Sequence, residues 1–166
     1  METKKELWLG IGLSILVLGV IVVWFGTNNA GTPVSQGEGE VLLASAESAF
    51  DFGAISMAAG KVRHQFTVTN PTAETVTVAK MYTSCMCTEA KLIIGNKERG
   101  PFGMPGHGVV PKINQQILPG EKVAVEVEFD PAAHGPAGVG TIERSVYLEQ
   151  SNGAPLELRI SARVTP

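Results

Sequence analysis

Charged residues and cysteines are both scarce in this chain of 166 residues. Charged residues make up 17% of the sequence and hydrophobic residues 44%, which excludes disorder over most of the length because disorder needs the opposite balance. There are 13 Lys and Arg against 16 Asp and Glu, and no run of basic residues follows Lys5. Without a basic patch the chain lacks the electrostatic signature of a nucleic-acid-binding protein.

The recognised catalytic motifs are also missing. The sequence has no Gly-x-Ser-x-Gly nucleophile elbow, no His-Glu-x-x-His pair, no phosphate-binding loop and no dinucleotide fingerprint. A cysteine nucleophile paired with His107 has no third group to orient it. We therefore expect that this protein is not an enzyme.

Residues 7–25 form an uncharged, strongly apolar run. At ~1.5 Å per residue a helix of this length spans ~28 Å, close to the thickness of a bilayer's hydrocarbon core. Trp8 and Trp24 lie near its two ends, as is typical of membrane interfaces, and Lys4 and Lys5 precede it. The sequence predicts a single transmembrane anchor, with residues 1–6 in the cytoplasm and the rest of the chain outside it.

A cleaved signal peptide is the alternative interpretation of the same run. Its apolar core would be ~7–15 residues long and would precede a small-x-small cleavage site, which is poorly matched near Asn28 and Ala30. Residues 26–40 are rich in Gly, Asn, Ser and Thr, and we interpret them as a flexible linker. Residues 41–166 then form one exported domain.

Apolar residues of the exported domain alternate with polar ones, which is typical of strands with one buried face. The alternation covers Val62–Val68, Val76–Val78, Val123–Phe129, Ile142–Leu148 and Leu156–Val164. Turn sequences separate these strands: Asn70-Pro71, Pro119-Gly120, Asp130-Pro131 and Ser151-Asn152-Gly153. The pattern predicts an all-β fold, an immunoglobulin-like antiparallel β-sandwich of about seven strands, preceded by the one transmembrane helix.

Short motifs recur in a familiar order along this domain. They are Phe50-Asp51-Phe52-Gly53, Asn70-Pro71, Ser84-Cys85-x-Cys87-Thr88, Pro119-Gly120-Glu121 and Phe129-Asp130-Pro131. Over residues 48–164 the chain resembles the bacterial family called domain of unknown function 1573, whose members are exported immunoglobulin-like domains related to ASH and MSP-like sandwiches. The resemblance implies a fold and an extracytoplasmic setting but no activity. Met86 departs from it, because the family usually has glycine between the two cysteines.

Cys85 and Cys87 are the only cysteines of the chain. On a strand both side chains would point to one face, with Cα atoms ~6.6 Å apart. That spacing is close to the upper limit for a disulfide, so a bridge between them would need a bend in the chain. Three interpretations stay open: a disulfide or exchangeable redox pair, a metal site, or inert packing.

If the pair binds a metal, its residue types favour Cu(I), which accepts thiolate, thioether and imidazole ligands. The candidate metal ligands are Cys85, Cys87, Met86, Met104 and His107, and copper is the one candidate cofactor. Of the other histidines, His134 is interpreted as a turn residue and His64 as a hydrogen-bonded histidine in or at the rim of the core.

Two functions are compatible with these observations. The first is a membrane-anchored, extracytoplasmic binding or scaffolding module, with a protein partner in the cell envelope that contacts the Gly/Pro-rich stretch 95–112 and an outward-facing Phe102. The second is an envelope copper-binding or thiol-redox protein built on the Cys-Met-Cys motif.

Overall fold

The computed structural model describes residues 39–106 and 110–166, which contain ten β-strands and two short 3₁₀ helices. The strands are β1 (Ala44–Ser45), β2 (Ala49–Ser56), β3 (Val62–Thr69), β4 (Val76–Thr83), β5 (Thr88–Ile94), β6 (Lys97–Phe102), β7 (Gln115–Ile117), β8 (Lys122–Phe129), β9 (Gly140–Gln150) and β10 (Leu156–Thr165). The 3₁₀ helices are η1 (Met57–Ala59) and η2 (Gly135–Gly138). The predicted all-β class is confirmed.

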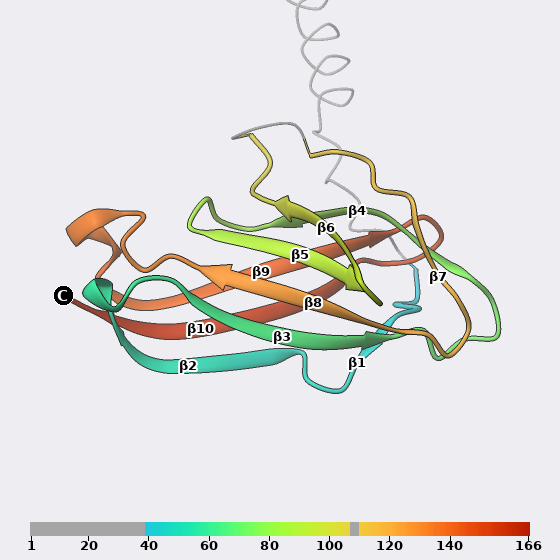
Figure 1. Cartoon of the computed structure of the whole chain (residues 1–166), viewed down its shortest axis with the longest axis horizontal. Helices are drawn as coiled ribbons and strands as arrows, with labels where there is room; N and C mark the ends of the chain where they lie inside the picture. Colours follow the sequence, from blue (N-terminus) through green and yellow to red (C-terminus); the bar gives the residue numbers. More distant parts are fainter. Residues whose placement is uncertain (1–38, 107–109) are drawn as a thin grey trace, which may run out of the picture. The chain divides into compact units, whose positions relative to one another are not determined.

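The strands form two sheets of five, stacked on one another (Figure 1). One sheet has the order β1-β3-β8-β5-β6 and the other β2-β10-β9-β4-β7. The predicted number of about seven strands was too low, because the prediction counted only the strands with strong alternation. The expectation of a wholly antiparallel sandwich also needs correction, since β2 pairs with β10 in parallel.

The core lies between the sheets and comes from the alternating strands. In β10 the residues Leu156, Leu158, Ile160, Ala162 and Val164 are all buried, while Glu157, Arg159 and Arg163 are exposed. The same alternation in β8 buries Val123, Val125, Val127 and Phe129. These strands were predicted from period-two patterns, and each buries the face that its pattern indicates.

Each predicted turn connects two strands. Asn70-Pro71 follows β3, Pro119-Gly120 precedes β8, Asp130-Pro131 follows β8, and Ser151-Asn152-Gly153 joins β9 to β10. Gly120 has φ +73°, a left-handed conformation that glycine adopts without steric cost. The predicted turns are therefore confirmed as connections between strands.

The stretch 95–112 differs from its predicted form. Gly95 and Asn96 form a two-residue hairpin turn that brings Lys97–Phe102 back along β5 as the edge strand β6. Phe102 is only 5% exposed and belongs to the core, so the expectation that it points outward was wrong. Its ring is buried because Phe102 pairs with Ala90 of β5, which is itself buried.

The predicted anchor, residues 7–25, lies outside the described residues, as do residues 1–6 and all but the last two residues of the predicted linker. Within 39–106 and 110–166, no helix has the length and apolar character needed to cross a membrane.

Candidate thiol site

The two cysteines lie in the tight turn between β4 and β5 rather than on an extended strand. The backbone N–H of Thr88 donates to the carbonyl of Cys85 at 3.1 Å, which closes a turn around Met86 and Cys87. Because β4 and β5 belong to different sheets, this turn crosses from one sheet to the other. It supplies the bend that brings the sulfurs together, with Sγ of Cys85 only 2.6 Å from Sγ of Cys87.

Two fully buried threonines hold this turn. The hydroxyl of Thr83 lies 3.0 Å from the carbonyl oxygen of Cys85 and 2.9 Å from that of Thr88, so it bridges the two ends of the turn. The Thr88 hydroxyl lies 3.7 Å from the Cys87 sulfur. Beyond the turn, the Asp130 N–H donates to the carbonyl of Cys87 at 2.9 Å. The cysteines are thus fixed to the connection between β8 and β9.

That connection brings a histidine to the thiols. His134 precedes η2, and its Nε2 lies 3.3 Å from Sγ of Cys85. The β4–β5 turn and η2 lie at the same end of the sandwich (Figure 1). One donor atom from each of Cys85, Cys87 and His134 lies within 4.8 Å of the other two, so this group has the composition and proximity of a metal site. The sequence interpretation of His134 as a turn residue was incomplete, because 47 positions separate it from Cys87 along the chain.

An arginine faces the second thiol. Arg144 Nε donates to Sγ of Cys87 at 3.3 Å. Along β9 the buried residues Ile142, Val146 and Leu148 alternate, and Arg144 occupies the position within this inward-facing series where an apolar residue would be expected. That interruption is the sequence signal that could have identified it.

The two thiols differ in exposure and in acidity. Cys85 is partly exposed and Cys87 is 3% exposed. Burial alone would raise the pKa of the Cys85 thiol, but hydrogen bonds from Cys87 and His134 and the charge of Arg144 outweigh it and bring that pKa to about 7. Burial raises the pKa of the Cys87 thiol, and its hydrogen bond to Cys85 raises it further, although Arg144 opposes both effects. Cys85 is therefore the thiol that ionises first.

Three further residues were predicted as metal ligands: Met86, Met104 and His107. Met86 lies at the centre of the turn with 51% of its surface exposed, and Met104 is partly exposed two residues after β6. His107 lies outside the described residues. Metal coordination by these three residues stays a prediction. His64, by contrast, is the hydrogen-bonded rim histidine that was expected. Its ring stacks on that of Phe50 with 3.6 Å between the ring centroids, and its Nε2 lies 2.9 Å from Oε2 of Glu47.

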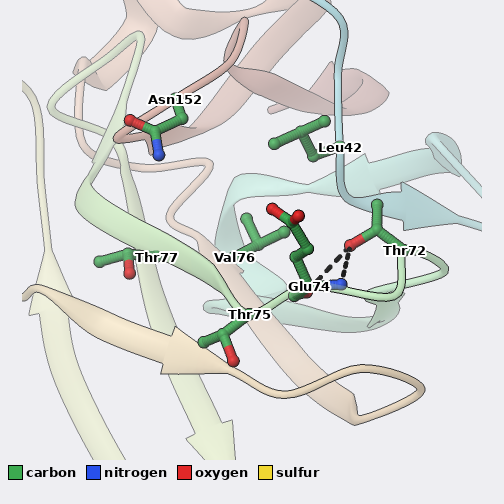
Figure 2. A pocket seen from close by; sticks show the side chains of 7 residues that line it. All are labelled: Leu42, Thr72, Glu74, Thr75, Val76, Thr77 and Asn152. Carbon is green, nitrogen blue, oxygen red and sulfur yellow. Dashed lines mark hydrogen bonds between the residues drawn. The ribbon is translucent and has the colours of Figure 1, made fainter.

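A separate pocket of about 330 Å³ lies near the start of β4, whereas the thiols follow the end of that strand. It is lined by Leu42, Thr72, Glu74, Thr75, Val76, Thr77 and Asn152, as Figure 2 shows. The Thr72 hydroxyl lies 2.9 Å from the Glu74 carbonyl oxygen, so part of this polar lining is satisfied within its own loop. The pocket lacks the soft donor atoms of the thiol site.

The family model described as "Protein of unknown function (DUF1573)" matches residues 43–100. The match runs from the residue before β1 into β6 and includes both cysteines, but it ends before His134 and Arg144. The resemblance stated from the motifs is confirmed over this segment. No curated protein matches the sequence.

Among solved structures, a protein of unknown function from Porphyromonas gingivalis W83 is similar with a TM-score of 0.54 and 11% identity. The alignment covers 80% of this chain and 51% of that protein, so the chain spans about half of its length. The ASH/PapD-like domain 7 of human CEP192 aligns with a TM-score of 0.43 and 11% identity, covering 76% of this chain and 87% of that domain. The Pseudomonas aeruginosa CupB2 chaperone aligns with a TM-score of 0.39 and 11% identity, and the alignment covers 73% of this chain and 55% of that chaperone. At such identities the Porphyromonas structure supports the fold alone.

Proposed function

We propose that this protein is an immunoglobulin-like binding module of the cell envelope, and that its thiol site binds Cu(I). Residues 7–25 would tether it to the membrane, with the sandwich on the extracytoplasmic side, as the apolar run and the position of Lys4 and Lys5 indicate. One observation carries the proposal: two thiols and an imidazole converge within 4.8 Å beside a cationic side chain.

The charge of the site favours Cu(I) over Zn²⁺. Two thiolates and one imidazole suit either ion, since Cu(I) accepts soft thiolate ligands together with imidazole and Zn²⁺ can keep an open fourth position on three such ligands. Two thiolates, one Cu⁺ ion and the Arg144 guanidinium sum to zero net charge, so a partly buried site would carry no uncompensated charge. With Zn²⁺ the same group would be left with one excess positive charge.

Binding requires a small rearrangement of the thiols. Two thiolates that bind one ion lie further apart than the present 2.6 Å between the sulfurs, so the two sulfurs would have to separate. Cys85 is the partly exposed member of the pair, so we expect its side chain, rather than that of buried Cys87, to make this movement. His134 is the exposed member of the group.

The test is a competition titration of the reduced full chain, in detergent, against a Cu(I) chelator of known affinity. Wild type should bind one Cu(I), Cys85→Ser with Cys87→Ser should bind none, and His134→Ala should bind at least about tenfold more weakly. Met104→Leu should weaken binding only if the stretch after β6 supplies a fourth ligand. If the double serine variant competes as well as wild type, the copper proposal is wrong.

A protein partner is a second candidate, favoured by the outer edge of β2. This eight-residue strand pairs with β10 on one side and is the edge strand of its sheet, with Asp51 as its only charged residue. The edge of β6, in contrast, carries Lys97, Glu98 and Arg99, the kind of charged edge that discourages strand addition. A photo-crosslinker at exposed Ala54 of β2 should therefore capture an envelope partner, while the same group at Glu98 should not. Equal yields at both positions, or none at Ala54, would exclude docking at β2.

A further inference from the structure

We infer that the reduced Cys85–Cys87 pair performs thiol–disulfide exchange with a solvent-exposed disulfide, with Cys85 as the attacking thiol and Cys87 as the resolving thiol. This activity uses the residues of the proposed copper site but does not depend on copper binding. Three features of the described residues support it without any bound metal.

The first support is the different access of the two sulfurs. Cys85 is partly exposed, so a disulfide in solution can reach its sulfur, whereas Cys87 is 3% exposed and shielded by its position in the core. Exchange depends on access to the attacking sulfur. The geometry therefore assigns the first step to Cys85.

The second support is the proximity of the resolving thiol. The turn closed by the Thr88 N–H and the Cys85 carbonyl leaves the two sulfurs 2.6 Å apart. An extended Cys-x-Cys segment would hold its Cα atoms ~6.6 Å apart, at the limit of what a disulfide spans. Because the turn has already removed that obstacle, a mixed disulfide on Cys85 would form next to the Cys87 sulfur.

The third support is the placement of a nitrogen atom beside each sulfur. His134 Nε2 lies 3.3 Å from Cys85 Sγ, and Arg144 Nε donates to Cys87 Sγ at 3.3 Å. A hydrogen bond donated to a sulfur, as Arg144 makes to Cys87, stabilises the anionic form that attacks and leaves in exchange. The imidazole of His134 lies within hydrogen-bonding distance of the attacking sulfur. An inert core pair would need neither group.

The reaction balances without a cofactor. The Cys85 thiolate attacks one sulfur of R–S–S–R′, the S–S bond breaks, and R′–S⁻ leaves with a proton taken from solvent. The Cys87 thiolate then attacks the Cys85 sulfur of the mixed disulfide and releases R–S⁻, which is also protonated. The protein dithiol is oxidised to the Cys85–Cys87 disulfide by two electrons, and the substrate disulfide is reduced to two thiols.

The test uses the reduced full chain in detergent, freed of metal with a chelator, and follows intact mass by mass spectrometry. With oxidised glutathione, wild type should lose two hydrogens and retain no adduct. Cys87→Ser should retain one glutathione on Cys85. Cys85→Ser should react at least about tenfold more slowly than wild type, because only the buried thiol is left. Parallel reactions with insulin, whose disulfides are borne by a folded protein, show whether the substrate is a small molecule or a protein. Cys→Ala variants at both positions provide the same comparison if a serine variant fails to fold.

The two proposals fail separately. If wild type remains fully reduced, or if Cys87→Ser gives no adduct while its circular dichroism matches wild type, exchange is refuted and the copper titration still stands. If copper does not bind but the adduct forms, only the copper proposal is lost. If both hold, oxidised protein should show no Cu(I) binding until dithiothreitol restores it, because the disulfide removes both thiolate ligands.

Discussion

Replacing Asn70 by alanine should destabilise the sandwich more than any comparable change of a surface asparagine. Asn70 is fully buried between β3 and β4, and its side chain is hydrogen-bonded at both ends. Nδ2 donates to the Glu74 carbonyl at 2.7 Å and to the Ile117 carbonyl at 2.9 Å, while Oδ1 accepts from the N–H and the hydroxyl of Thr72. The side chain thus joins the β3–β4 loop to β7.

The magnitude follows from which partners lose contact with water. The Ile117 carbonyl is buried, so losing this donor costs about 1–3 kcal/mol. The partners at Thr72 and Glu74 lie nearer to solvent and can be rehydrated, so each contributes about 1 kcal/mol or less. We expect the free energy of unfolding to fall by about 2–4 kcal/mol in total, which lowers Tm by roughly 5–15 °C in a domain of this size.

Urea unfolding of the full chain in detergent, followed by the β-sheet signal in circular dichroism, measures this change. Asn152→Ala is the matched control, because Asn152 is exposed on the β9–β10 turn, and its free energy of unfolding should change by less than about 0.5 kcal/mol. If Asn70→Ala lowers the free energy of unfolding by less than about 1 kcal/mol, with an unchanged slope against urea concentration, the buried hydrogen bonds do not hold the loop as we argue.

Two further predictions concern the thiol site and the topology. The alkylation rate of Cys85 should rise only about tenfold between pH 6 and 8 and then level off, because its pKa of about 7 places half-ionisation in that interval, whereas a thiol of ordinary pKa would gain about eightyfold. Iodoacetamide labelling read by peptide mass spectrometry measures the profile, and a rate still rising steeply above pH 8 would contradict the lowered pKa. If residues 7–25 anchor the chain as proposed, protease added to intact spheroplasts should digest the sandwich. Protection that ends only when the membrane is lysed would place the domain on the cytoplasmic side.

The strands with strong alternation were predictable because burial of one face imposes period two on the sequence. β3, β8 and β10 each follow this rule, and Asn70-Pro71 and Asp130-Pro131 mark where two of them end. The hairpin of β5 and β6 was not predictable in the same way. β6 is an edge strand with five exposed residues, so its sequence carries almost no burial pattern.

The sequence by itself determined the all-β class and the position of most turns, because these depend on local alternation and turn chemistry. By residue type alone it also indicated the cysteine pair as a candidate site. Only the tertiary structure decided which residues complete the thiol site. His134 and Arg144 reach the cysteines through the β8–β9 connection and through β9, elements far from residue 85 along the chain. Proximity in sequence indicated only Met104 and His107, whose part in the site stays a prediction. Which distant residues gather at one end of a two-sheet sandwich is set by strand order, and strand order follows from packing across the whole core.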